Sequence, residues 1–339
     1  MATFKIYKLF FTAPLHIGDH HEDGSSSLRT IQSDTLYAAL TSCLAKTGNA
    51  IPKDGDLGFT VSSLFPYYQQ SSDSRPIYFL PMPFRSRQPE LQDVSKAKKL
   101  KKVQWVDCAL YSNILNGVFS LADADKIIPY IQGSYLTMDL LPLDEDGSCE
   151  FVNSELSQRV TLKSRIGQED AKPYYVDKIV FRHHAGLFFF AEGDTTLLDK
   201  ALHILSMEGI GTDRNIGFGF FEFSTDSLSL DLPQETEYQM ALSLMIPENE
   251  EQLKQLMASD SVAYDFIRRG GWITTYPFTT IRKCAIYGFL PGSVFKKETG
   301  QECKPIGRIV NLAPEVGELS PDHPIWRNGK SIMLPIKLI

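Results

Sequence analysis

An α+β fold is predicted by the alternation of strand-like and helix-like patterns, which occur twice along the chain. Residues 1–225 show a strand, a helix, a long intervening segment, further strands, a helix, a glycine-rich loop and a last strand. A shorter series occupies residues 236–339. This order is that of a split β-α-β, or ferredoxin-like, unit. We therefore expect two ferredoxin-like domains, the first carrying a large insertion at about residues 49–160.

The composition is that of a globular protein large enough for two domains. The chain has 339 residues, of which 43% are hydrophobic and 22% are charged, and both fractions are ordinary for such proteins. No apolar run approaches the roughly 18 residues of a membrane span. Residues 1–12 carry Lys5 and Lys8 inside their apolar stretch, which is not a signal-peptide layout. We expect a cytoplasmic protein that does not engage a membrane.

Cysteines and charges exclude several kinds of site. The five cysteines are scattered and form no Cys-x-x-Cys pair, which argues against disulfides and a structural zinc site. Residues 19–23 (DHHED) suggest a metal site, but adjacent ligands on a polar loop rarely converge on one ion, so a solvated loop is favoured. We expect no metal and no cofactor. The net charge of −7 means that any RNA binding must use local basic patches.

The first domain opens with a strand and an amphipathic helix. The strand covers residues 3–12, and Pro14 ends it. Ser33 is predicted to cap the helix, with Asp34 favourably placed at the positive end of the helix dipole. Apolar residues at positions 36, 39, 40, 43 and 44 follow with helical spacing, and Gly48 ends the helix.

A hairpin is predicted further along the first domain. After a strand at residues 159–163, the segments 176–182 and 187–191 have strand patterns separated by a turn, and we expect them to pair. His183 and His184 at the turn could serve acid–base chemistry, but a polar hairpin tip is the favoured interpretation.

A helix and a strand then flank the glycine-rich loop. The helix has a buried stripe at positions 197, 198, 201, 202 and 205 and ends at Gly209, and the strand covers residues 218–223. Residues 226–233 are expected to be a linker. The second domain is predicted to contain a strand at 238–246, a helix at 248–257, a sharp turn at 265–272, and strands at 283–290, 307–312 and 331–338.

The glycine-rich loop of residues 209–223 is the first candidate for a binding site. It holds Gly209, Gly211, Gly217 and Gly219, with Arg214 and Asn215 at its centre. Successive backbone N–H groups in such a loop can cradle a phosphate, and arginine adds a planar charged fork. No Gly-Lys-Ser/Thr follows this loop, so it is not a Walker loop, and a dinucleotide fingerprint would open a helix after a strand. A plain turn remains the alternative.

A lysine-rich segment is the second candidate. Between Arg85 and Trp105 there are seven basic and two acidic residues, a local charge of +5. Such a segment can grip phosphates with little sequence preference. A solvated helix face explains it equally well.

These features, in their order, resemble the RAMP superfamily of CRISPR RNA-binding proteins, and more narrowly the fourth subunit of the Csm (type III-A) effector. The glycine loop after a helix and the two RRM-like, ferredoxin-like units carry the broader resemblance. The narrower one rests on residues 14–18, 33–40, 64–67, 79–83, the lysine run ending at Lys102, and residues 269–272, 291–295 and 323–327.

The resemblance implies a non-catalytic subunit that caps the repeat-derived 5′ tag of crRNA. It also implies partners: the large signalling subunit, the backbone RAMP subunit, and target RNA near a hairpin or thumb, within the first-domain insertion, that interrupts guide–target pairing. Single-stranded RNA is held by amides, basic groups and stacking planes. The expected RNA-binding residues are therefore His16, Gly18, Lys98, Lys99, Lys101, Lys102, Arg165, Gly209, Gly211, Arg214, Asn215, Gly217, Gly292 and Ser293.

Two alternatives remain. The first is a RAMP endoribonuclease that trims precursor crRNA, for which His16 is the attractive general acid–base. No Lys or Tyr pair is fixed beside it by spacing. The second is a structural adaptor that does not contact RNA.

Overall fold

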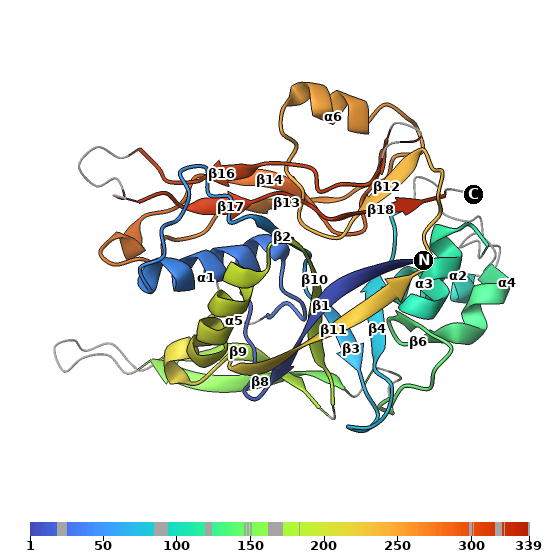
Figure 1. The fold of residues 1–339 in the computed structure, drawn as a ribbon. Helices are drawn as coiled ribbons and strands as arrows, with labels where there is room; N and C mark the ends of the chain where they lie inside the picture. The colour runs from blue at the N-terminus through green and yellow to red at the C-terminus, as the bar shows by residue number, and fades with distance from the viewer. Residues whose placement is uncertain are drawn as a thin grey trace.

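The computed structural model describes most of the chain. The described residues are 1–18, 26–84, 94–118, 124–145, 147, 149, 151–161, 172–182, 184–297, 300, 302–315, 321 and 323–337. Figure 1 shows an α+β molecule in which a large sheet of the first two thirds lies beneath smaller strands of the last third. Within the described residues, no helix is long and apolar enough to cross a membrane.

A nine-stranded mixed sheet forms the centre of the molecule. Its order is β11-β1-β10-β3-β4-β5-β7-β6, and β2 also pairs with β10. Only β5 and β7 are parallel among these pairs. The strands are β1 (Ala2–Phe11), β2 (Phe59–Val61), β3 (Phe65–Tyr68), β4 (Ile77–Pro81), β5 (Trp105–Asp107), β6 (Ile131–Gln132), β7 (Tyr135–Leu136), β10 (Gly186–Gly193) and β11 (Phe221–Leu230). The range 49–160, expected as an insertion, thus supplies β2 to β7 of this sheet.

Each face of the sheet is covered by a hydrophobic core. Side chains alternate along β1 and β10, so successive residues of these strands enter opposite cores. Tyr7 and Phe189 lie in a core with α1 (Ser33–Lys46) and α5 (Thr196–Glu208). Ile6, Phe188 and Phe190 lie in a second core on the other face. That core includes α3 (Cys108–Leu115). The helical stripes expected in α1 and α5 are confirmed as buried or partly buried.

Further short helical elements lie at the end of the sheet that is far from α5 (Figure 1). They are α2 (Val94–Lys102), α4 (Ala124–Ile127) and the 3₁₀ turn η1 (Ile128–Tyr130). Residues 94–102 of the lysine-rich segment therefore form a helix.

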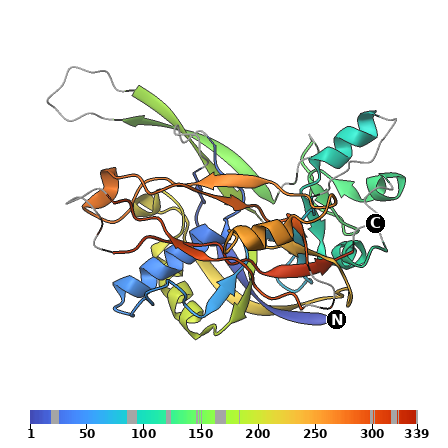
Figure 2. The same ribbon diagram turned by 90° about the horizontal axis from the view of Figure 1, so that it is seen from above.

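The hairpin differs from the one expected. β9 (Lys172–Phe181) pairs along its whole length with β8 (Val152–Thr161), not with β10. The prediction of a hairpin between 176–182 and 187–191 is wrong, because β10 is buried on both faces and lies inside the central sheet. β8 and β9 instead form an arm that projects from the body (Figure 2). His183 lies outside the described residues.

The last third of the chain forms three small sheets. β12 (Tyr238–Ala241) lies between β15 (Val294–Lys296) and β18 (Met333–Ile336). Two ribbons pair β13 (Phe266–Arg269) with β14 (Ile286–Phe289), and β16 (Ile309–Asn311) with β17 (Trp326–Asn328). Helix α6 (Glu250–Leu256) and the turn η3 (Phe278–Thr280) complete this part.

Two predictions for the segments on either side of residue 236, a linker and a sharp turn, are wrong. Residues 226–230, expected in a linker, belong to β11, because β1 is ten residues long and its partner pairs with it as far as Ala2. The segment 265–272, expected to turn sharply, contains β13. In addition, the strand expected at 238–246 ends at Ala241.

The start of α1 joins the two parts of the chain. Gln32, not Ser33, is the N-cap residue, and the Ser33 hydroxyl accepts the Leu244 amide instead (2.9 Å). Asp34 is fully buried and forms ion pairs with Arg269 (2.8 Å) and Arg327 of the C-terminal part. The Asp34 carboxylate therefore links the two parts of the chain, in addition to its favourable position at the start of the helix.

Candidate nucleic-acid interface

The glycine-rich loop is closely packed against backbone, which explains its glycines. Gly209, Gly211, Gly217 and Gly219 all have positive φ, between 74° and 97°. A Cβ at Gly211 would lie 2.4 Å from the carbonyl oxygen of His16, and one at Gly219 would lie 1.9 Å from that of Ile210. Only glycine combines these φ values with such an approach.

The loop uses several of its own amides internally. Gly209, Gly217 and Gly219 donate to the carbonyls of Leu205 (2.8 Å), Arg214 (3.1 Å) and Pro14 (2.8 Å). These three glycines therefore shape the loop rather than present their N–H groups to a ligand. Its apex remains exposed: the turn η2 (Arg214–Ile216) projects Arg214 and Asn215 into solvent. The apex is the part available to an anion.

His16 lies beside the loop, as expected, but its ring faces inward. The His16 carbonyl accepts the Thr212 amide (3.0 Å). The imidazole is 6% exposed, and its Nδ1 hydrogen-bonds to the carbonyl of Asp177. A carbonyl only accepts, so Nδ1 donates. His16 thus ties the loop to β9. Gly18, two residues on, is exposed and bridges to Ser27.

The arm β8–β9 is fastened to the same segment. Leu15 and Ile179 exchange both backbone hydrogen bonds (2.7 and 2.8 Å). The buried carboxylate of Asp177 accepts the Ser154 hydroxyl (2.6 Å) and the Ser27 amide (2.9 Å). The arm, residues 14–18 and the glycine loop therefore form one connected unit.

An ion pair closes this unit at its surface. Arg159 of β8 contacts Asp213 of the loop (2.6 Å), and its guanidinium lies 5.2 Å from the ring centroid of Phe218. Asp213 is the one non-glycine residue with positive φ (62°) within the described chain. Since Arg159 compensates Asp213, the exposed Arg214 gives the apex an excess positive charge.

The lysine helix lies elsewhere. The side chains of Lys98, Lys99, Lys101 and Lys102 are exposed on α2, and Lys96 pairs with Asp125. Figures 1 and 2 both place α2 at the opposite end of the molecule from α5, which leads into the glycine loop. The two candidate patches expected to hold RNA are therefore separate surfaces.

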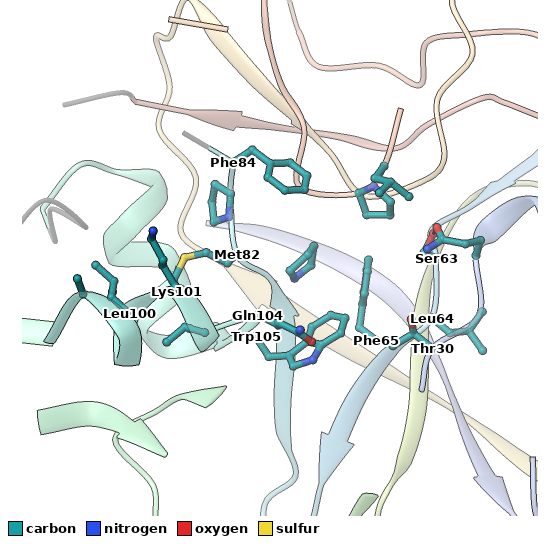
Figure 3. Close-up of a pocket in the computed structure, with 17 residues that line it drawn as sticks. Thr30, Ser63, Leu64, Phe65, Met82, Phe84, Leu100, Lys101, Gln104 and Trp105 are labelled. Carbon is teal, nitrogen blue, oxygen red and sulfur yellow. Dashed lines mark hydrogen bonds between the residues drawn. The ribbon is translucent and has the colours of Figure 1, made fainter. Parts of the chain in front are cut away.

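Gly292 and Ser293 lie near the lysine helix rather than the glycine loop. The Gly292 carbonyl accepts the Phe84 amide (2.8 Å). Ser293 is fully buried and its hydroxyl donates to the Asp265 carbonyl (3.4 Å), so its side chain faces the protein, and its expected role as a clamp on a nucleotide stays a prediction. Beside them, Lys101 and Trp105 line a cleft of about 590 Å³ between the two parts of the chain (Figure 3).

Other expected features lie outside the described residues. Arg165 and the acidic, histidine-rich segment 19–23 belong to this group. Among the residues that the structure does describe, no three His, Cys, Asp or Glu side chains gather in a way that could hold a metal ion. Burial, reinforced by the Glu208 carboxylate, raises the pKa of the Cys43 thiol beneath the loop to about 11, so this thiol stays protonated near neutral pH.

Sequence reasoning missed Asp177, Arg159 and Asp213. Each is an ordinary charged residue in a strand or loop, and its partners lie between 23 and 161 residues away. Asp213 carries the clearest signal, since aspartate tolerates positive φ in a loop otherwise rich in glycine. The pairing of β8 with β9, which brings these residues together, was not predicted.

Comparisons with known proteins identify relatives along most of the chain. Residues 234–336 match the CRISPR Csm4 C-terminal domain family. The "CRISPR system Cms protein Csm4" of Mycobacterium tuberculosis (strain CDC 1551 / Oshkosh) is 26% identical over 333 residues, covering 95% of this chain and 94% of that protein. A protein of the same name from Thermococcus onnurineus (strain NA1) is 26% identical over 261 residues, covering 71% and 75%.

Solved structures share the fold. One is the crystal structure of a Csm1–Csm4 cassette in complex with cA4, with a TM-score of 0.59 and 18% identity over 100% of this chain and 99% of that one. Another is the crystal structure of a Csm3–Csm4 subcomplex of the type III-A CRISPR-Cas interference complex, with a TM-score of 0.59 and 19% identity over 98% and 100%. At these identities the likeness is one of fold.

Proposed function

This chain belongs to the Csm4 family of type III-A CRISPR proteins, and from that premise we propose that it is a non-catalytic RNA-binding subunit. In this proposal it caps the repeat-derived 5′ tag of crRNA at the glycine loop. It also joins the large signalling subunit to the backbone of repeated RAMP subunits, in the cytoplasm and without a cofactor.

The observation that carries this proposal is the exposed apex of the glycine loop. Arg214 offers a guanidinium fork, which suits a phosphate. The apex is held by the His16 carbonyl behind it and by Arg159 beside it. A charged group on so well-braced a loop is positioned before the ligand arrives, which reduces the entropy cost of binding.

The surroundings of His16 support a role without catalysis. An endoribonuclease needs a general base within reach of the scissile 2′-hydroxyl, whereas this imidazole is buried and bonded to the Asp177 carbonyl. His16 and Gly18 then act by positioning the loop and its neighbouring turn. The arm β8–β9 is the element that we assign to the thumb beside the tag.

We also propose partners and domains on the same basis. Relatives of this fold were crystallised as a Csm1–Csm4 cassette and a Csm3–Csm4 subcomplex, and we assign equivalent partners to this chain. The order β11-β1-β10-β2 with α1 and α5 supports a ferredoxin-like first domain. It extends to the end of β11, and a second such domain covers residues 236–339.

A titration with tagged RNA tests the function. Purified protein is added to end-labelled RNA carrying the repeat-derived 5′ tag, or a scrambled tag, and samples are run on native and denaturing gels. We expect a tag-dependent shift with intact RNA. Cleaved RNA would favour the endoribonuclease instead, and His16→Ala would then abolish cutting.

A charge-reversal variant tests the site. Arg214→Glu is expected to weaken binding of tagged RNA at least tenfold, because it replaces a phosphate-binding cation by an anion. Arg75→Glu is the matched control, since Arg75 is exposed on the turn between β3 and β4, outside the loop. Unchanged affinity of the Arg214 variant in the assembled complex would support a structural adaptor.

A further inference from the structure

The ribbon of residues 264–289, which contains β13 and β14, has one anchored face and one outward face. Phe266 lies opposite Phe289, and Arg268 lies opposite Tyr287. Since side chains alternate along a strand, these four lie on one face. Arg269 points the other way, to the buried carboxylate at the start of α1. The aromatic face is therefore turned away from the Asp34 cluster, and at one end of it Phe289 packs against Phe295 of the core.

The aromatic side chains of this face are exposed. Tyr264, Phe266 and Tyr287 have 47%, 54% and 59% of their surfaces accessible. Phe266 and Tyr287 pack edge to face with centroids 5.8 Å apart, which leaves ring faces open. Leu253 and Met257 of α6 and its following turn close one side of a hollow of about 290 Å³ above these rings. Such a cluster of exposed apolar side chains marks an interaction site.

The charges of the ribbon favour an anionic ligand. Arg269 and Lys283 belong to the buried Asp34 cluster. The exposed charges of the ribbon are therefore Arg268, Arg282 and one acidic residue, Asp265, a local charge of +1 in a chain of −7. Arg268 is exposed and makes no ion pair with any residue in the described ranges. Further along, the Arg282 guanidinium lies 4.6 Å above the ring of Trp272, which is half exposed.

We propose that the outward face of this ribbon is a stacking surface for single-stranded RNA. Exposed rings accept bases of any sequence, and the interleaved arginines meet phosphates or stack in turn. We favour RNA over a protein partner, because an apolar protein surface would not need the exposed arginines that lie among these rings. Figures 1 and 2 place the turn between β13 and β14 at the end of the molecule toward which the arm β8–β9 also projects, so one strand could reach both.

This surface is distinct from the glycine loop and does not depend on tag recognition. The test therefore uses the full chain and a labelled oligouridylate without a tag. Phe266→Ala combined with Tyr287→Ala is expected to weaken binding tenfold or more, the effect of losing one or two stacked bases. Arg268→Gln, an exposed single change, is expected to weaken it about threefold. Met138→Ala with Leu140→Ala removes equally exposed apolar side chains outside the ribbon and is expected to change binding less than twofold.

Cross-linking decides where the RNA lies. With 4-thiouridine in the oligonucleotide, we expect cross-linked peptides from residues 264–289. Cross-links confined to other segments, or unchanged affinity in both ribbon variants, would overturn the proposal. Unchanged RNA affinity together with loss of a copurifying protein subunit would also overturn it and make this face a protein-docking site. Tag recognition is measured separately, as the difference in affinity between tagged and scrambled RNA, so failure of tag recognition is distinguishable from failure here.

Discussion

At the scale of single residues, the contacts of Asp34 join the two parts of the molecule. The carboxylate is fully buried and receives a two-pronged contact from Arg269 (2.8 and 3.2 Å) and another from Arg327. Burial alone would raise the pKa of Asp34, but the two guanidinium groups outweigh it and lower the pKa. The stability from this carboxylate is therefore present above its ordinary pKa and is lost as the pH falls through the lowered value.

Asp34→Asn is expected to destabilise the protein strongly. It leaves two buried guanidinium groups without their counter-charge, which typically costs about 3–5 kcal/mol. Urea unfolding measures the change. Glu250→Gln is the control, because its pair with Lys254 is exposed and contributes about 0.5 kcal/mol or less. Equal effects of the two substitutions would show that the Asp34 cluster does not hold the two parts together.

The lowered pKa of Lys283, near the same cluster, leads us to expect a change in the free energy of unfolding at mildly alkaline pH. Burial, aided by Arg327, lowers its pKa from 10.5 to about 8. Between these values the unfolded chain binds more protons than the folded one, so stability should rise with pH, by up to about 3 kcal/mol. Lys283→Met should be more stable than the parent at pH 8 and lose this part of the rise. Parallel stability curves for the two proteins from pH 7 to 10 would contradict the assignment.

At the scale of elements, the glycine loop illustrates what geometry adds to composition. Four glycines suggest amides for a phosphate, yet three of those amides donate to carbonyls of the protein. The sequence identified the right loop and the right neighbour, residues 14–18. It could not identify the bonds of Gly219 to Pro14 and of Thr212 to His16, because they depend on the approach of the segment that follows β1.

Comparing Gly211→Ala with Gly217→Ala distinguishes the cost of a positive φ from the cost of a steric clash with neighbouring backbone. Both residues have φ of 97°, but only Gly211 has a carbonyl 2.4 Å from the position of a new Cβ. Gly217→Ala should cost about 1–2 kcal/mol, from the left-handed conformation alone. Gly211→Ala should cost more, about 3–5 kcal/mol, because backbone must also move. Thermal melting of both variants checks this, and equal losses would show that His16 does not press on the loop.

Strand pairing was the least predictable feature among the elements. The strands at 176–182 and 187–191 were located nearly correctly, but their partners were not. Alternating exposed side chains such as Leu156 and Tyr174 suit the projecting arm, whereas the continuous apolar run of 186–191 belongs within a sheet. This difference in pattern indicates that the two strands belong to different sheets. The ion pairs of Asp34 offered no such signal, since they join residues more than 200 positions apart.

At the scale of the whole molecule, the positive patches are dispersed in a chain of net charge −7. The fold class and the position of the loop could be predicted, because local patterns determine them. The separation of the lysine helix from the loop could not, because it depends on the order of strands in the central sheet. Figure 1 shows that sheet running between the two sites. An RNA that contacts both must therefore span the molecule.

This separation predicts that RNA length decides which residues matter. Changing Lys98, Lys99, Lys101 and Lys102 together to Gln should leave the affinity for a short tag RNA unchanged, while Arg214→Glu weakens it. For RNA long enough to reach α2, the quadruple change should also reduce the salt dependence, by up to about 3 in the slope of log affinity against log salt, since each phosphate contact contributes about 0.7. Titrations at several salt concentrations measure both effects. If the quadruple variant weakened short and long RNAs equally, the lysines would act through the chain's overall charge rather than as a separate phosphate-binding surface.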